Sequence, residues 1–368
     1  MHSTPKTRFA IGITLISASF LATLIISACM QQPTKQSTHA VPGHVRNFTL
    51  YVRDNQIKMP DGKQIYSFGY TDDPRGRSRL PGPTIEVDEG DTVNITLVND
   101  KDPTSGNPPS GGDGHTIHLH GLDLPSQFDG DPMTAPGGSV KQGKSFTYHF
   151  VANHPGTYWY HCHEEAPEHI QMGMYGPLIV HPRGDHHHAY PNTTAYDKEY
   201  TFLLSDIDSQ EHDDDYNTLF KGSPETNWTQ YHPNYFLING KAWPDTMMDP
   251  TTSITATVGQ KVLVRLINAG NVMRAMHSHG FHFQVIGTDG RKLDSPYFKD
   301  TLAIAPGERY DILLDLNQVG RYMFHDHVEY ATTNNGVAVG GIVTMINVNK
   351  PDGSNPVPMP PINGTPED

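Results

Sequence analysis

Two histidines flank a cysteine in the stretch YHCHEEAPEHIQMGM, at residues 160–174. Cys162, one of two cysteines in the 368-residue chain, lies directly between His161 and His163. Thiolate and imidazole are ligands for soft and borderline metals such as copper and zinc. The stretch therefore predicts a metal site, and the high count of 22 histidines agrees with that prediction.

Other histidines also come in pairs with one residue between them. On a β-strand, residues i and i+2 face the same side, so each pair presents two imidazoles on one face. Eight imidazoles exceed what one four-coordinate zinc ion uses, and imidazole also binds copper, iron and nickel, so several metal ions are expected. The four pairs are His118 and His120, His161 and His163, His277 and His279, and His325 and His327.

The same strand parity separates Cys162 from its two neighbours. If His161 and His163 face one way, the thiol faces the other way, on the side of His115 if residues 115–120 stay extended. Two histidines, one cysteine and a weakly held methionine form the ligand set of a blue-copper electron-transfer site. The candidate ligands of this second site are His115, Cys162, His169 and either Met174 or Met172.

Short alternating segments position these residues. PTIEVDEGDTVNITLVN, at 83–99, alternates apolar and polar residues as half-buried strands do, and Gly, Pro, Asn and Asp separate such segments throughout the chain. This pattern predicts an all-β sandwich.

The pattern occurs twice. TATVGQKVLVRLIN, at 255–268, repeats the strand, glycine and strand order of the first copy. HLHGLDL at 118 matches HSHGFHF at 277, an offset of 159, and GTYWYHCH at 156 matches GRYMFHDH at 320, an offset of 164. We therefore expect two homologous domains.

The first 28 residues are typical of an export signal, with a basic start at 1–8 and an apolar run at 9–28. The run is about long enough to span a bilayer, so an uncleaved anchor is the alternative. The ending Ile26-Ser27-Ala28-Cys29 resembles the bacterial lipobox, which implies cleavage before Cys29 and lipidation of that cysteine. We expect the mature protein on an extracytoplasmic membrane surface of a bacterial cell envelope.

The expected organisation follows from these boundaries. His186, His187 and His188 lie in the polar segment between the domains, where a solvated loop is preferred over loose metal binding. The formal charge of −14, or −16 without a leader carrying Lys6 and Arg8, argues against nucleic acid as a partner. We expect a signal peptide at 1–28, a lipid-anchored linker at 29–41, a first domain at 42–182, a linker at 183–199, a second domain at 200–348 and a Pro-rich tail at 349–368.

Four segments resemble the copper motifs of multicopper oxidases, the family that includes the laccases. They are HTIHLHG at 115–121, YHCHEEAPEHIQMGM at 160–174, HSHGFHF at 277–283 and FHDH at 324–327. GPTIEVDEGD, NYFLINGKAWPDT and IAPGERYDILLDL resemble the family's framework, so the resemblance covers nearly all of residues 42–348. It implies an all-β fold of two tandem cupredoxin-like Greek-key β-sandwich domains.

The resemblance also implies four copper ions per functional site. Met174 is preferred to Met172 because its spacing from His169 resembles the family's pattern. The implied ligands are His115, Cys162, His169 and Met174 for type 1 copper, His118 and His277 for type 2 copper, and His120, His161, His163, His279, His325 and His327 for the type 3 pair.

The second domain departs from the type 1 pattern. The two offsets place Arg274, Asp326, Thr333 and Ala338 at the positions equivalent to the type 1 ligands. None keeps the ligand chemistry, so the second domain is expected to lack this copper, as in two-domain oxidases with type 1 copper in the first domain only.

The implied activity couples one-electron oxidation of a phenol, an aryl amine or a low-valent metal ion to four-electron reduction of O2 to water. By resemblance, Asp129 and Glu165 match acidic residues that deliver protons, although acids in loops are usually only solvated. Two-domain relatives complete each trinuclear site between the first domain of one subunit and the second domain of the next, which implies a homotrimer.

Two other functions stay open. A copper-containing nitrite reductase has the same two-domain plan, but its cysteine is not followed directly by a histidine, so His163 speaks against it. A non-catalytic copper-binding or storage lipoprotein would be blue without consuming oxygen, and a sandwich loaded with zinc would be colourless.

Overall fold

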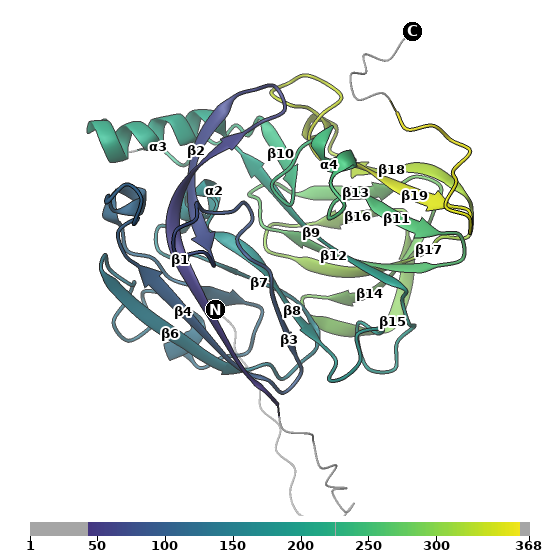
Figure 1. The fold of residues 1–368 in the computed structure, drawn as a ribbon, viewed down its shortest axis with the longest axis horizontal. Helices are drawn as coiled ribbons and strands as arrows, with labels where there is room; N and C mark the ends of the chain where they lie inside the picture. The colour runs from purple at the N-terminus through teal and green to yellow at the C-terminus, as the bar shows by residue number, and fades with distance from the viewer. Residues whose placement is uncertain (1–42, 225, 361–368) are drawn as a thin grey trace, which may run out of the picture. The chain divides into compact units, whose positions relative to one another are not determined.

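The computed structural model describes residues 43–224 and 226–360, which form β-sheets with short helices between them (Figure 1). The predicted all-β fold is confirmed. The predictions for the signal peptide and the lipid-anchored linker fall on residues 1–41, outside the described part of the chain. In the described ranges, no helix combines the length and the apolar character needed to cross a membrane.

Two sheets make up the first half of the chain. One contains, in spatial order, β2 (Gln64–Thr71), β1 (Val45–Lys58), β4 (Thr92–Asn99) and β6 (Lys144–Val151). The other contains β3 (Ile85–Asp88), β8 (Tyr175–His181), β7 (Gly156–His161) and β5 (His118–His120).

The second half repeats this plan. One sheet contains β10 (Tyr235–Ile238), β9 (Lys198–Ile207), β12 (Lys261–Asn268), β17 (Arg309–Asp315), β14 (Phe283–Thr288) and β15 (Arg291–Lys299). The other contains β11 (Ile254–Thr257), β19 (Val343–Asn349), β18 (Gly320–Asp326), β13 (Arg274–Ser278) and β16 (Thr301–Ile304).

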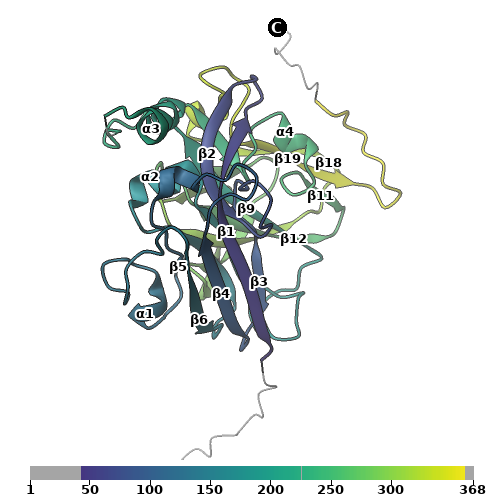
Figure 2. The same cartoon turned by 60° about the vertical axis from the view of Figure 1, so that its left-hand side comes forward.

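Short helices connect the strands. Figure 2 shows α1 below β5, and contacts join α1 to both β5 and β6. The helices are η1 (Pro109–Gly112), α1 (Ser126–Asp129), α2 (Ala166–Met172), α3 (Ser209–Lys221), α4 (Asp245–Met248) and η2 (Glu329–Thr332).

The two alternating segments form strands as predicted, but the strands of each segment belong to different sheets. β3 and β4 lie in opposite sheets of the first half, and β11 and β12 lie in opposite sheets of the second. Along β4, buried and partly exposed residues alternate without interruption, as one face on the core requires. Along β12, every residue after Lys261 is buried, because β7 of the first half contacts the other face.

Each half has its own hydrophobic core between its two sheets. In the first half the core contains Leu50, Ile95 and Leu178, and it also encloses Cys162 and Met174. In the second half an equivalent core is built from β9, β12, β14, β17 and β19. The thiol of Cys162 therefore belongs to the interior of the first sandwich.

The segment between the halves is less exposed than its composition suggests. Tyr190 and Tyr196 are buried against Leu263 and Leu313 of the second half, and β9 already begins at Lys198. The Tyr190 hydroxyl donates a hydrogen bond of 2.5 Å to Asp311. Two aromatic anchors thus dock this segment on the second sandwich, although its histidines and prolines had indicated a polar loop.

Candidate metal centres

The structure brings together the three strongest predicted ligands of the thiol site. His115, Cys162 and His169 are fully buried, and one ligand atom of each lies within 4.8 Å of the others. Cys162 Sγ is 3.2 Å from His169 Nδ1. His115 is paired with Val140, Cys162 directly follows β7, and His169 lies in α2.

The α2 segment returns the chain to Cys162. Gly173 ends α2 with a φ of 117°, and its amide donates to the carbonyl of His169. The Met174 amide donates to the same carbonyl at 2.9 Å, and the Cys162 amide donates to the Met174 carbonyl at 3.0 Å. This bond fixes the Met174 backbone beside Cys162. Met172 is equally buried but has no hydrogen bond to Cys162 among those between described residues.

The chemistry of the thiol site fits a copper ion. His115 Nε2 is 2.7 Å from Ser110 Oγ, whereas its Nδ1 is buried without a hydrogen-bond partner, as a metal-binding nitrogen would be. Burial lowers the pKa of His169 to about 3 and that of His115 well below its usual range, so both imidazoles are neutral. Without a metal, burial raises the pKa of the Cys162 thiol to about 11. Cys162 Sγ also accepts a hydrogen bond of 3.3 Å from the Thr116 amide, which favours a thiolate ligand.

The paired histidines of the first half form a second group on the other side of β7. His118, His120 and His161 have ligand atoms within 4.8 Å of one another. His120 Nδ1 lies 3.2 Å from His161 Nε2. The ring centroid of His163 lies 5.3 Å from the ring centroid of His118. The separation of Cys162 from its neighbours that strand parity predicted is therefore present.

The second half has a matching group. His277, His279 and His325 have ligand atoms within 4.8 Å of one another, and His279 Nε2 lies 3.1 Å from His325 Nε2. The ring centroid of His327 lies 5.4 Å from the ring centroid of His277. Two ring nitrogens that face each other so closely can share a metal ion.

Hydrogen bonds to backbone carbonyls orient four of these rings. His118 Nδ1 donates to the carbonyl of Asp129 at 2.7 Å, and His277 Nδ1 donates to that of Asp300 at 2.9 Å. His161 Nδ1 and His325 Nδ1 each donate to the carbonyl of the next residue, at 2.8 and 3.0 Å. Because Nδ1 of each ring is bound to a carbonyl, Nε2 is the nitrogen left to bind a metal, an arrangement common for metal-bound histidines.

Within one chain the two groups stay apart. Among residues 43–224 and 226–360, each cluster of three histidines within ligand distance comes from one half only. His118 and His277, the predicted type 2 ligands, are therefore not brought together in the same group. Spacing along strands does not report the distance between sheets, but the resemblance to two-domain relatives, which complete each trinuclear site between subunits, had implied such a separation.

The second half holds an ion pair where the first holds its thiol site. Arg274 and Asp326 are fully buried, with Arg274 Nη1 3.6 Å from Asp326 Oδ2. Asp326 belongs to none of the clusters of His, Cys, Asp and Glu found in the described ranges, and Thr333 and Ala338 stand at the positions equivalent to His169 and Met174. The predicted loss of the type 1 ligand set from this half agrees with the geometry.

The two predicted proton-delivery residues differ in placement. Asp129 Oδ2 lies 3.3 Å from His118 Nδ1, so its carboxylate contacts the first histidine group. The Glu165 side chain is exposed, while its carbonyl accepts hydrogen bonds from the amides of Glu168 and His169 at the start of α2. Sequence reasoning missed Asp131, whose Oδ1 lies 3.9 Å from His163 Nδ1, although Asp131 shares the QFDGDP loop with Asp129.

Gly130 is needed for the contact between Asp129 and His118. Its φ is 84°, and a Cβ there would lie 2.0 Å from the carbonyl oxygen of Ile117. Gly130→Ala is expected to lower the free energy of unfolding by about 1–3 kcal/mol and to displace Asp129. Equilibrium unfolding in urea measures this loss in the free energy of unfolding. Gly62→Ala is the matched control, because Gly62 has a φ of 91° with no atom near its Cβ position, and a larger loss in the control would contradict the steric argument.

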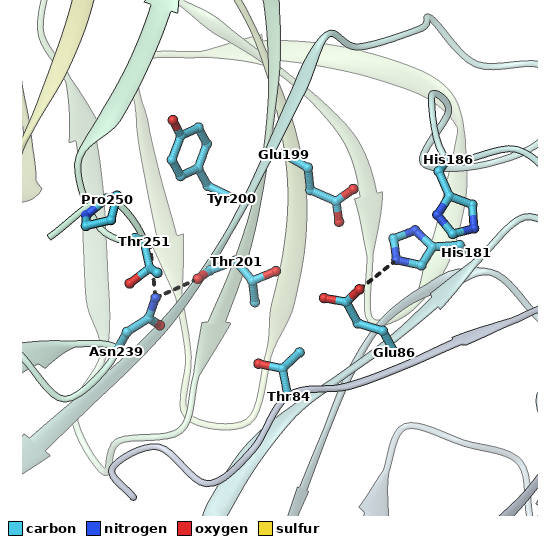
Figure 3. Close-up of a pocket in the computed structure, with 10 residues that line it drawn as sticks. All are labelled: Thr84, Glu86, His181, His186, Glu199, Tyr200, Thr201, Asn239, Pro250 and Thr251. Carbon is cyan, nitrogen blue, oxygen red and sulfur yellow. Dashed lines mark hydrogen bonds and ion pairs between the residues drawn. The ribbon is translucent and has the colours of Figure 1, made fainter. Parts of the chain in front are cut away.

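A separate pocket of about 480 Å³ lies outside these groups. Figure 3 shows Glu86 facing His181, with His186 beside it, and Glu199 farther along the wall. None of its lining residues belongs to the predicted ligands. The pocket is therefore not the metal centre.

Two β-sandwiches, one thiol site and two groups of paired histidines define a two-domain copper protein of the cupredoxin-like type. The chain belongs to the multicopper oxidase family, whose models match residues 77–185 and 198–350. Copper is the cofactor that this membership implies.

Individual proteins support the assignment. The crystal structure of a blue copper oxidase from Nitrosomonas europaea superimposes with a TM-score of 0.69 at 33% identity, covering 83% of this chain and 86% of that one. Laccase-8 of Oryza sativa subsp. japonica is 30% identical over 85% of this chain and 51% of its own length. Copper resistance protein A of Pseudomonas syringae pv. tomato is 28% identical over 64% of this chain and 41% of its own length. The chain thus spans about half, or less, of these two curated relatives.

Proposed function

We propose that the protein is a copper-dependent oxidase that takes single electrons from a reducing substrate and delivers four of them to O2, forming water. The observation that carries this proposal is the position of Cys162. Its side chain lies in the buried thiol site, while its two chain neighbours face the histidine group. Copper in these sites would supply one-electron redox chemistry.

The side chains have distinct roles in this proposal. His115, Cys162, His169 and Met174 hold the electron-entry metal. The backbone from Cys162 to His161 and His163 gives electrons a short covalent route to the histidine group. His118 and His277 are assigned to type 2 copper, and the remaining paired histidines to the type 3 pair. Asp129, in contact with His118, is the favoured residue for holding and passing a proton.

Oxygen uptake tests the proposal directly. Copper-loaded protein is expected to consume O2 when given a phenol, an aryl amine, or a cuprous or manganous salt, with four donor electrons used per O2. A blue protein with full copper that consumes no oxygen with any of these donors would favour copper storage instead. Nitrite reduction without oxygen uptake would favour the reductase alternative.

A homotrimer is part of the proposal because one chain separates its two histidine groups. A head-to-tail contact places the first half of one subunit against the second half of the next, and such contacts close into a ring. We also propose that the mature protein lies on an extracytoplasmic membrane surface, held by a lipid on Cys29. The lipobox-like ending at Cys29 supports this location. Cys29→Ala is expected to abolish labelling by radioactive fatty acid, because the residue that would carry the lipid is gone, and to leave the leader at 1–28 uncut; labelling that persists would overturn the lipid anchor.

A further inference from the structure

The environment of Asp326 matches that of Cys162 in the other half. Asp326 lies between His325 and His327, as Cys162 lies between its two histidines. The Thr116 amide donates to Cys162 Sγ at 3.3 Å, and its repeat equivalent, the Ala275 amide, donates to Asp326 Oδ1 at 2.8 Å. A side-chain acceptor of the equivalent backbone amide therefore occupies the same place in both sandwiches.

Asp326 ties together the backbone on both sides of the second histidine group. Its Oδ1 also accepts a hydrogen bond of 3.0 Å from the Val328 amide. The His327 amide donates to the Ala275 carbonyl at 2.7 Å, and His277 pairs with His325 between β13 and β18 (Figure 1). The carboxylate and these backbone bonds together hold residues 325–328 against β13, which carries His277 and leads directly into His279.

Arg274 provides the charge that allows a carboxylate to be buried here. The guanidinium and the carboxylate are both fully buried, and an isolated buried charge is costly. Arg274 also bonds to Asp206, which accepts a hydrogen bond of 3.1 Å from the Asn271 amide. The guanidinium lies over the ring of Phe236, 5.3 Å from its centroid. Arg274 stands at the position equivalent to His115, where the first half would hold its copper.

We propose that Asp326, which lies 3.6 Å from the Arg274 guanidinium, is a positioning residue for the second-half histidine group and takes the place that Cys162 has in the first half. The inference rests on the proposed copper site at His277, His279, His325 and His327. Asp326 does not touch copper or O2 in this proposal. Asp326 instead fixes the backbone at residues 325–328, and through that backbone it orients the rings of His325 and His327.

Two double variants remove the charges of Arg274 and Asp326 together, and Asp206 loses its guanidinium partner in both, so the variants differ in whether residue 326 can accept hydrogen bonds. Arg274→Gln with Asp326→Asn keeps an oxygen that can accept from Ala275 and Val328, whereas Arg274→Met with Asp326→Leu does not. In the full protein, the first variant is expected to bind copper like the wild type. The second is expected to bind cluster copper about 10- to 100-fold more weakly, as loss of outer-shell partners does elsewhere. Chelator competition measures the affinity, and the blue absorbance should persist because the thiol site is untouched.

A second buried pair serves as the matched control. Arg265 Nη1 lies 3.5 Å from Asp311 Oδ1, with both side chains buried, but neither residue belongs to a histidine group. Arg265→Met with Asp311→Leu is expected to leave copper affinity unchanged. Weakening in this control as large as in the Arg274 and Asp326 pair would mean a general loss of stability and would overturn the proposal.

Other results would also reject it. Wild-type affinity in the Met and Leu variant, or equal weakening in both double variants, overturns the acceptor role. If the Met and Leu variant does not fold, Asp326→Glu keeps the charge and moves its oxygens by one methylene; unchanged copper affinity in that variant overturns the proposal. Failure of the wild-type protein to bind copper through these histidines would instead reject the proposed function.

Discussion

Replacing Cys162 by serine is expected to remove the blue colour and the oxidation of every reducing donor, and to lower the copper content from four ions per chain to three. A hydroxyl is a poor ligand for copper in a site that selects soft donors, so the thiol site loses its metal. The covalent route to His161 and His163 then has no electron entry point. The paired histidines face away from the substituted side chain and keep their copper.

Visible absorbance, copper analysis and oxygen uptake check this expectation together. Serine is close to cysteine in size, so the core around residue 162 keeps its volume. Met172→Leu is the matched control, since Met172 is fully buried in the same core but is not the preferred axial ligand. The control should stay blue and active. Donor oxidation that survives in Cys162→Ser would show that electrons enter elsewhere.

Strand periodicity explains why most of this arrangement could be predicted. A period of two fixes which side of β7 each residue faces, so the sequence alone separates Cys162 from His161 and His163. The repeat offsets likewise identified Arg274 and Asp326 as the replacements for two ligands. These conclusions depend only on local geometry and on equivalence between copies.

Contacts between distant segments could not be predicted in this way. Nothing in the sequence shows that Tyr190 docks on the second sandwich or that Arg274 bonds to Asp206. Glu165 resembles a proton-delivery residue by spacing, and its role stays a prediction; that it would cap α2 with a φ of 43° and an exposed side chain could not be foreseen. Each of these features depends on how distant segments of the chain pack against one another. Residue spacing along one strand carries no information on that packing.

Two defective chains are expected to restore activity when they are produced together. In one chain, His118→Ala and His120→Ala disable the first half; in the other, His277→Ala and His279→Ala disable the second. Each chain alone should be inactive. In a head-to-tail ring of three, every mixed trimer contains one junction at which an intact first half meets an intact second half.

The expected recovery follows from the symmetry of the ring. With equal amounts and random assembly, about three quarters of the trimers contain both chains, and one of their three sites is complete, so about a quarter of the wild-type oxygen uptake returns. Different affinity tags on the two chains isolate the mixed trimers. Mixing the two proteins after separate purification is the control and should restore little if subunits do not exchange. Purified mixed trimers without activity would mean that each site is built within one chain. A monomer that binds four copper ions would mean the same, because His118 and His277 would then have to come together inside a single subunit.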